Sequence, residues 1–325
     1  MIVPEFWAEA RQQGRIGSRQ VTVRRWGWSD VSQQEAQAHA ETRAAQAFSR
    51  LEAGESLARR ELKRSYNGAE GVPIREEIIS RHGNTVITRN IYGARCLNTP
   101  EVLFADINFA YEPALRAHWL AIASLLPIAV LVGAATQSWR LGGISLLLSL
   151  FLGPFLARGL HRLWMSAAGG VEQQALTRVR AFSDRHPDWH LRVYRTPGGL
   201  RVLVMHRTFA ADESAVAEFF RALDTDPIYV RMCLHQRCFR ARVSAKPWRA
   251  GIEKHILPRP GVWPINPVRL PERLRWVTAY EQTARRFAAC HFLTSLGSKA
   301  VHPAAQSVQQ LHDELCQANS SLPLA

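Results

Sequence analysis

The chain has 325 residues, and its 41 lysines and arginines against 27 aspartates and glutamates give a formal net charge of +14 at pH 7. This length can bury a full core, and a hydrophobic content of 47% excludes a disordered chain and a polytopic transporter. A strongly basic surface favours phosphate-bearing partners, meaning nucleotides, nucleic acid or anionic lipid headgroups. The same charge also fits the cytoplasmic excess of lysine and arginine in membrane proteins.

The cysteines are odd in number and scattered, which predicts reduced thiols and no disulfide framework. They are Cys96, Cys233, Cys238, Cys290 and Cys316. The first residues, MIVPEFWAEARQQGR, carry early charges and no apolar core, so we expect no secretory signal peptide.

Residues 1–60 are predicted to form an N-terminal helical region. It opens with a basic, tryptophan-bearing patch, VTVRRWGWSD, and continues with an alanine-rich stretch. Ser32 and Glu35 have the spacing of a capping box, and Gly54 is a suitable C-terminal stop. We expect this helix to support the fold and to read no ligand.

Residues 61–117 are predicted to form the first half of a cytoplasmic α+β domain. Residues 76–80 (EEIIS) and 85–89 (TVITR) favour strands, and the RHGN between them indicates a hairpin. The apolar strand EVLFADINF follows at residues 101–109.

Residues 118–158 are predicted to form a transmembrane hairpin. The runs Trp119–Gln137 and Leu141–Ala157 contain no charged residue, and each is near the lower bound of the roughly 17–25 residues that cross a hydrocarbon core. Neither run has the polar face of a surface helix. The alternative is a helical hairpin buried inside a soluble core.

The charges that flank these runs predict the orientation of the hairpin. Arg116 precedes the first run and Arg158 and Arg162 follow the second, whereas the short connection contains only Arg140. The positive-inside rule then places both termini in the cytoplasm of a two-span cell-membrane protein, in contact with the lipid bilayer.

Residues 159–255 are predicted to form the second half of the α+β domain, and residues 256–325 a C-terminal helical region. The stretch 171–190 is predicted to form an amphipathic helix that ends near Pro187. It leads into two alternating strands on either side of Pro-Gly-Gly at 197–199, the strongest hairpin signal in the chain. We expect the strands on both sides of the membrane insert to assemble into one sheet with flanking helices.

Two polar side chains interrupt the strand LFADINFA. Since side chains alternate along a strand, Phe104, Asp106 and Asn108 share one face. A carboxylate and an amide at this spacing could converge on Mg²⁺ or Mn²⁺, which prefer oxygen ligands. The alternative is a strand end at which both side chains cap the following turn.

His206 ends a second strand, in which Val202 and Val204 share its face and Arg195 and Arg201 lie near the turn. Such a histidine could contact phosphate or position a nucleophile, although a structural role is the alternative.

These features together resemble the archaeo-eukaryotic primase superfamily. Its first motif is two acidic residues one apart at the end of an apolar strand, and LFADIN is similar with an amide in place of the second acid. Its second motif ends in a strand histidine, and LVMH is similar but lacks the small residue. Its third motif is a further acidic residue, for which RALDTDPIY offers Asp224.

The resemblance implies an RRM-like sheet and a metal-dependent nucleotidyltransferase that binds nucleotide or nucleic acid. Asp106 and His206 would be catalytic, and Asp106, Asn108 and Asp224 would hold Mg²⁺ or Mn²⁺. The implied phosphate-binding residues are Arg195, Arg201, Arg240, Arg242 and Lys246. The last three lie in the basic segment CFRARVSAKPW. The amide at Asn108 departs from the family pattern, which leaves open an active enzyme, a weakened one, or a binding domain that keeps only the fold.

Two further possibilities come from the residues alone. Cys233, His235 and Cys238 are of types that bind zinc, but their spacing is not that of a zinc knuckle. The competing function is a non-enzymatic two-span membrane protein whose basic domain binds nucleic acid, anionic lipid or a protein.

Overall fold

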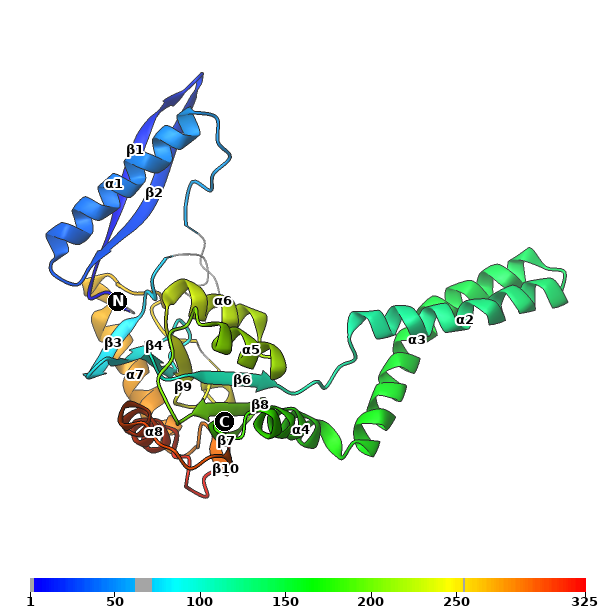
Figure 1. The fold of residues 1–325 in the computed structure, drawn as a ribbon. Helices are drawn as coiled ribbons and strands as arrows, with labels where there is room; N and C mark the ends of the chain where they lie inside the picture. The colour runs from blue at the N-terminus through cyan, green and yellow to red at the C-terminus, as the bar shows by residue number, and fades with distance from the viewer. Residues whose placement is uncertain (1–2, 62–71, 254) are drawn as a thin grey trace.

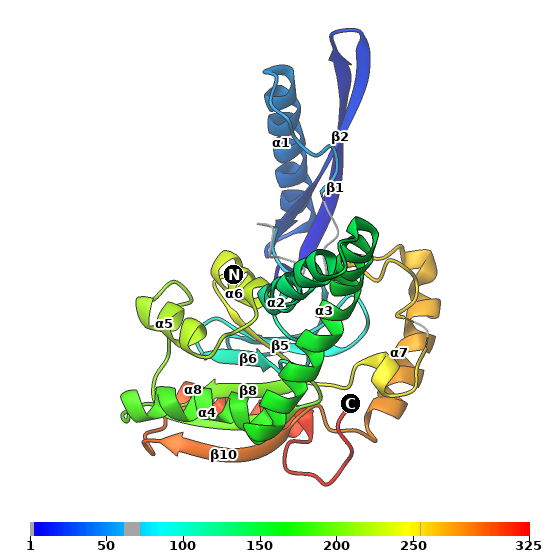
Figure 2. The same ribbon diagram turned by 90° about the vertical axis from the view of Figure 1, so that its right-hand side faces the viewer.

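The computed structural model describes residues 3–61, 72–253 and 255–325. The predicted boundary between residues 60 and 61 adjoins a stretch, 62–71, that lies outside the described residues. In the described part, three antiparallel sheets and eight α-helices form an N-terminal projection, a central α+β body and a long helical hairpin (Figures 1 and 2).

The N-terminal projection is a two-stranded hairpin covered by one helix. Strands β1 (Phe6–Ile16) and β2 (Arg19–Ser29) pair along their whole length, and α1 (Gln33–Glu52) packs on them. The predicted helix cap is confirmed, because the Ser32 side chain accepts a hydrogen bond from the Glu35 amide at 3.1 Å. The helical prediction for residues 1–60 missed the hairpin, in which buried Val21 and Val23 alternate with the less buried Gln20, Thr22 and Arg24.

The central body contains two four-stranded antiparallel sheets. The first has the order β10 (His291–Gly297), β7 (His190–Thr196), β8 (Gly199–Val204) and β6 (Phe104–Asn108). The second has the order β3 (Glu77–His82), β4 (Thr85–Arg89), β5 (Arg95–Thr99) and β9 (Phe239–Arg242).

Strands from both sides of the apolar insert do assemble together, because β6 pairs with β8 and β5 pairs with β9. The expectation of one sheet is wrong, since β6 and β9 are each the last strand of a separate sheet. The mixed α+β class is confirmed, whereas an RRM-like topology is not. The predicted hairpins β3–β4 and β7–β8 are both present.

Helices cover both faces of the first sheet. On one face, His312 of α8 (Pro303–Cys316) lies 5.4 Å from the Phe104 ring and 4.8 Å from the Tyr194 ring. At the other face, Phe182 of α4 (Gly170–Arg185) and Phe219 of α5 (Ser214–Ala222) pack against Trp189, with ring centroids 5.1 and 5.4 Å away. The sheet is therefore buried on both sides.

The C-terminal region is less helical than predicted. Helices α7 (Leu270–Ala284) and α8 are present, but residues 291–297 form β10 at the edge of the first sheet. This edge position gives β10 one strand partner, β7, and leaves Leu293 exposed and Leu296 half-buried. The weak apolar alternation of HFLTSLG is the only local signal for that strand.

The predicted membrane insert is an antiparallel pair of helices, α2 (Leu115–Ala135) and α3 (Trp139–Ala167), which projects from the body (Figure 1). Both are long and apolar enough to cross a membrane, and only 11% and 17% of their apolar windows are buried. Leu120, Leu131 and Leu147 are each more than 60% exposed, which excludes a hairpin hidden in a soluble core. In its second half α3, which contains Pro154, turns away from α2 (Figure 1).

Candidate functional site

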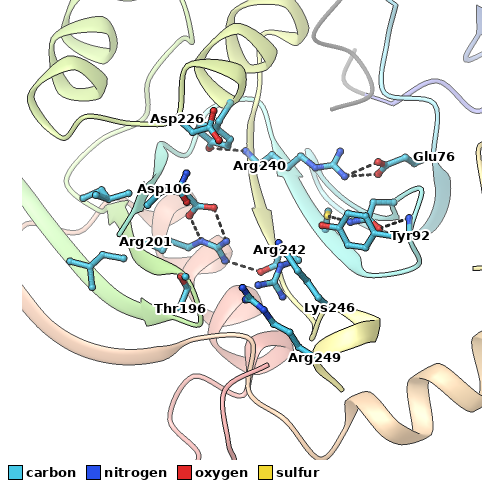
Figure 3. A pocket seen from close by; sticks show the side chains of 17 residues that line it. Glu76, Tyr92, Asp106, Thr196, Arg201, Asp226, Arg240, Arg242, Lys246 and Arg249 are labelled. Carbon is cyan, nitrogen blue, oxygen red and sulfur yellow. Dashed lines mark hydrogen bonds and ion pairs between the residues drawn. The ribbon is translucent and has the colours of Figure 1, made fainter. Parts of the chain in front are cut away.

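A pocket of about 330 Å³ opens where β6 and β9, the edge strands of the two sheets, lie next to each other (Figure 3). Its walls also include the β7–β8 turn, the β4–β5 loop, the start of α6 (Pro227–Gln236) and the segment after β9. The Tyr229 hydroxyl links the two sheets, since it donates to the Phe104 carbonyl at 3.1 Å and accepts from the Arg240 amide at 3.2 Å.

The close approach of backbones on one wall depends on the Pro-Gly-Gly turn. A Cβ added at Gly199 would lie 1.8 Å from the Ile107 carbonyl oxygen, so only glycine lets β8 begin against the end of β6. This turn places Asp106 directly opposite Arg201 in the register.

An ion pair between Asp106 and Arg201 forms the floor of the pocket. Arg201 Nε and Nη2 donate to the two Asp106 carboxylate oxygens at 2.7 and 3.1 Å. Burial opposes the guanidinium charge, but the Asp106 carboxylate outweighs it, so the pKa of Arg201 is raised. Because Arg201 is only 2% exposed, this pair fixes the floor and does not offer a free phosphate ligand.

A second ion pair closes one end of the pocket. Arg240 Nη2 contacts both Glu76 carboxylate oxygens, at 2.8 and 2.7 Å, and Arg240 Nη1 donates to Asn98 Oδ1 at 3.1 Å. Both partners of this pair are buried. Arg240 is therefore also committed to the fold.

Three cations on the remaining wall have no such partner. Arg242, Lys246 and Arg249 face the same space (Figure 3), and none forms an ion pair with an aspartate or glutamate in the described part of the chain. Arg242 Nη1 donates to the Ser244 carbonyl and lies 3.5 Å from an oxygen of the terminal residue, Ala325. Burial, and then the charges of Arg242 and Arg249, lower the pKa of Lys246, which shows that the three cations repel one another.

Most of the sequence-predicted residues gather in this pocket. Its lining includes the predicted residues Asp106, Asn108, Arg201, Arg240, Arg242 and Lys246. The other three lie elsewhere. Arg195 pairs with Glu172 at 2.6 Å, and Asp224, whose side chain is 79% exposed, pairs with Arg178 at 2.9 Å.

His206 lies on the opposite side of the first sheet from Asp106. It follows β8 and packs between Trp189 and Phe209, at ring distances of 4.9 and 5.6 Å. Burial, followed by the Arg207 charge, lowers its pKa. Since Asp106 and Arg201 point to the α8 face, the structure does not bring His206 and Asp106 into one site.

The predicted divalent-metal residues do not converge. Both Asp106 oxygens are taken by Arg201, Asn108 is exposed, and Asp224 is outside the pocket. The candidate zinc residues also separate, because Cys233 and Cys238 are buried whereas His235 is exposed. Within the described residues, the one close group of three metal-ligating side chains is Cys290, His312 and Cys316.

The sequence interpretation missed several pocket residues. Arg249 directly follows the basic segment CFRARVSAKPW, which ends at Trp248, so a window one residue longer would have included it. Tyr92 and Thr196 carry no local signal, because only the pairing of β5 with β9 and of β8 with β6 brings their loops to the pocket.

No protein-family model, no curated protein and no solved structure matches this chain. Its function is therefore inferred from the chemistry of the pocket.

Proposed function

We propose that this protein is a membrane-anchored domain that binds a phosphate-bearing ligand of nucleotide size in the pocket between β6 and β9. The observation that carries this proposal is the group of three cations on one wall, Arg242, Lys246 and Arg249, none of which pairs with an aspartate or glutamate in the described residues. Like charges held close together raise the free energy of the site, and a phosphate group would relieve that repulsion.

The dimensions of the pocket support a small ligand. A volume of about 330 Å³ is at the lower end of the range for small-molecule sites, roughly 300–1,000 Å³, so a mononucleotide fits better than a polymer. Arginines bind phosphate through two parallel hydrogen bonds, and Asn108 and Thr196 provide polar groups around the rest of the ligand.

The proposal is one of binding, because the Asp106 carboxylate is engaged by Arg201. The primase resemblance remains the alternative, and it requires Asp106 to leave this ion pair and hold Mg²⁺ or Mn²⁺. Metal-dependent nucleotide incorporation that is lost in Asp106→Ala would favour the primase alternative.

The membrane anchor in this proposal is the α2–α3 hairpin. Arg116 at one end and Arg158 and Arg162 at the other place both termini on the cytoplasmic side of the cell membrane under the positive-inside rule. The pocket then faces the cytoplasm, where nucleotides are abundant.

The test is a comparison of two triple variants of the full chain in detergent micelles. Ligand binding is measured by calorimetry with a nucleotide panel and with inorganic phosphate. Arg242→Ala/Lys246→Ala/Arg249→Ala should weaken binding at least roughly tenfold to a hundredfold, since each hydrogen bond to a charged group contributes about 1.5–3 kcal/mol. The matched control, Arg180→Ala/Arg185→Ala/Arg221→Ala, removes the same charge from exposed positions on α4 and α5.

Equal binding by the two triple variants would contradict the pocket assignment. Binding of nucleic acid or anionic vesicles that falls steeply with salt and is equal in both variants would favour a diffuse basic surface instead.

A further inference from the structure

A buried cluster of two cysteines and one histidine lies directly behind the pocket floor. The ligand atoms of Cys290, His312 and Cys316 are all within 4.8 Å of one another, and all three residues are 0% exposed. Cys290 Sγ is 3.8 Å from His312 Nε2. Thiolate and imidazole ligands around one zinc ion are roughly 3.5–4 Å apart, given metal–ligand bonds of about 2.0–2.3 Å, so only a small contraction is needed.

The fold brings the three residues together from two segments. His312 and Cys316 are one turn apart on α8, and therefore lie on the same helix face. Two backbone hydrogen bonds hold the chain around Cys290 against the end of that helix, from the Ala289 amide to the Cys316 carbonyl and from the Phe292 amide to the Ala318 carbonyl, both 2.9 Å.

Both ring nitrogens of His312 have polar neighbours, and Nε2 lies next to both Arg201 and the Cys290 thiol. Nδ1 lies 2.9 Å from an Asp313 oxygen, to which it donates, and Nε2 accepts from Arg201 Nη1 at 3.3 Å. Asp313 is itself held by Arg192 at 3.0 Å and by Gln309. A carboxylate that orients the far nitrogen of a histidine is the usual support for a metal-bound imidazole.

The charges of the surrounding groups also fit an ion with two thiolates. Two thiolates cancel the charge of Zn²⁺, and the neighbouring Arg201 charge is already balanced by Asp106. Arg201 Nη1 keeps a second acceptor, the Arg242 carbonyl at 2.8 Å, if the metal takes the Nε2 lone pair. The same carbonyl lies 3.9 Å from Cys316 Sγ, so a small shift would supply an oxygen as a fourth ligand.

We infer that Cys290, His312 and Cys316 form a binding site for a thiophilic closed-shell metal ion, and that this ion is Zn²⁺ in the cell. The ion replaces the two thiol protons, which leave to solvent, and it ties α8 to the start of β10. Through Arg201, the site also supports the floor of the pocket. The inference does not depend on the proposed ligand.

The metal content of the full-length protein tests this directly. Protein purified in detergent without chelator from zinc-supplemented cells should contain about one zinc per chain by mass spectrometry of the elements. After removal of zinc, titration with Co²⁺ should give sulfur-to-cobalt charge-transfer absorption, which then disappears as Zn²⁺ is added.

Variants identify the ligands. Cys290→Ala and Cys316→Ala should each abolish the charge-transfer band. Cys233→Ala/Cys238→Ala, which removes two buried thiols near β9, should keep both the band and the zinc. Asp313→Asn keeps the size of the side chain but removes the charge that orients His312 and pairs with Arg192, and it should weaken zinc binding roughly 10–100-fold.

Wild-type protein that is folded but contains no zinc and gives no cobalt–sulfur absorption would overturn the inference, whatever the variants do. A Cys290–Cys316 disulfide in protein purified without reductant would also overturn it, because the two sulfurs would then be a redox pair. A band that persists in both single-cysteine variants would assign the metal to other residues.

Discussion

Arg201 contacts both the pocket floor and the cysteine–histidine cluster of the central body. Its guanidinium binds the Asp106 carboxylate, the Arg242 carbonyl and His312 Nε2, and it lies between the pocket and the cysteine cluster. A charge buried to this degree is stable only while its partners remain, because removal of one member of a buried pair costs about 3–5 kcal/mol. The ion pair accordingly belongs to the floor of the pocket, and the residues available to a ligand are those around it.

Lys246 should make the proposed ligand binding depend on pH. Burial and the charges of Arg242 and Arg249 hold its pKa below the ordinary 10.5, so it loses its proton at a lower pH than an exposed lysine does. Phosphate affinity should therefore fall as the pH rises towards 10.5. In Lys246→Arg the charge persists, and the fall should be absent or shifted to higher pH.

Calorimetric titrations of both proteins over this pH range make the comparison. Identical pH profiles would show that Lys246 does not contact the ligand. Stability should change with pH in the opposite direction to ligand affinity. Between the lowered pKa of Lys246 and 10.5, the folded chain holds fewer protons at Lys246 than the unfolded chain does. The free energy of unfolding therefore rises with pH across that window.

At the scale of elements, the α2–α3 pair depends on small residues where its two helices approach most closely. A Cβ at Gly153 would lie 2.4 Å from Ile122 Cγ1 and 3.0 Å from Ile122 Cα, whereas a Cβ at Gly143 meets nothing within 4 Å. Ser149 Oγ lies 3.5 Å from the Leu125 carbonyl, within the same contact. Small residues that let backbones approach are typical of helix pairs in membranes.

Gly153→Leu should therefore separate the two helices, while Gly143→Leu serves as the matched control on the same helix. We expect the Gly153 variant to lose about 1–3 kcal/mol of stability, the usual cost of overpacking, and the control to stay near wild type. Unfolding midpoints in detergent micelles give this difference. Equal midpoints for the two variants would mean that the helices do not pack in the observed register.

The strands show which elements a local sequence pattern can predict and which it cannot. The β7–β8 hairpin follows directly from Pro-Gly-Gly between two alternating runs, and the α1 cap follows from Ser32. β10 was predicted as helix because its side chains are only half-buried at a sheet edge, which leaves a weak alternation. An edge strand is defined by its partner, β7, which is about 100 residues away in sequence.

At the scale of the whole molecule, the exposed apolar surface of α2 and α3 is consistent with the proposed two-span membrane anchor. Such a surface is unstable in water, and a two-span anchor leaves both flanking regions on the same side of the membrane. In inside-out membrane vesicles, protease should remove tags from both termini. In sealed right-side-out vesicles, both tags should be protected.

A cysteine at Gln137, in the short connection between the helices, gives the complementary result. Gln137→Cys should react with a membrane-impermeant maleimide only in right-side-out vesicles, and the five native cysteines, all buried, provide a low background. Labelling from the same side as the termini would exclude the two-span arrangement.

The sequence by itself determined the features that depend on neighbouring residues: the apolar hairpin, two β-hairpins, the capped helix and the basic segment around Arg242 and Lys246. It also indicated six of the residues that line the pocket, since strand alternation places Asp106 and Asn108 on one face.

Only the tertiary structure decided how these features combine, because the decisive contacts join residues far apart in the chain. Asp106 meets Arg201 and Glu76 meets Arg240, so two predicted phosphate ligands became structural ion pairs. His206 has the residue type of a catalytic group but extends from the opposite face of the sheet. Strand register and helix packing determine on which side of a sheet a strand-end residue lies and which partner it contacts there. A local sequence pattern contains neither.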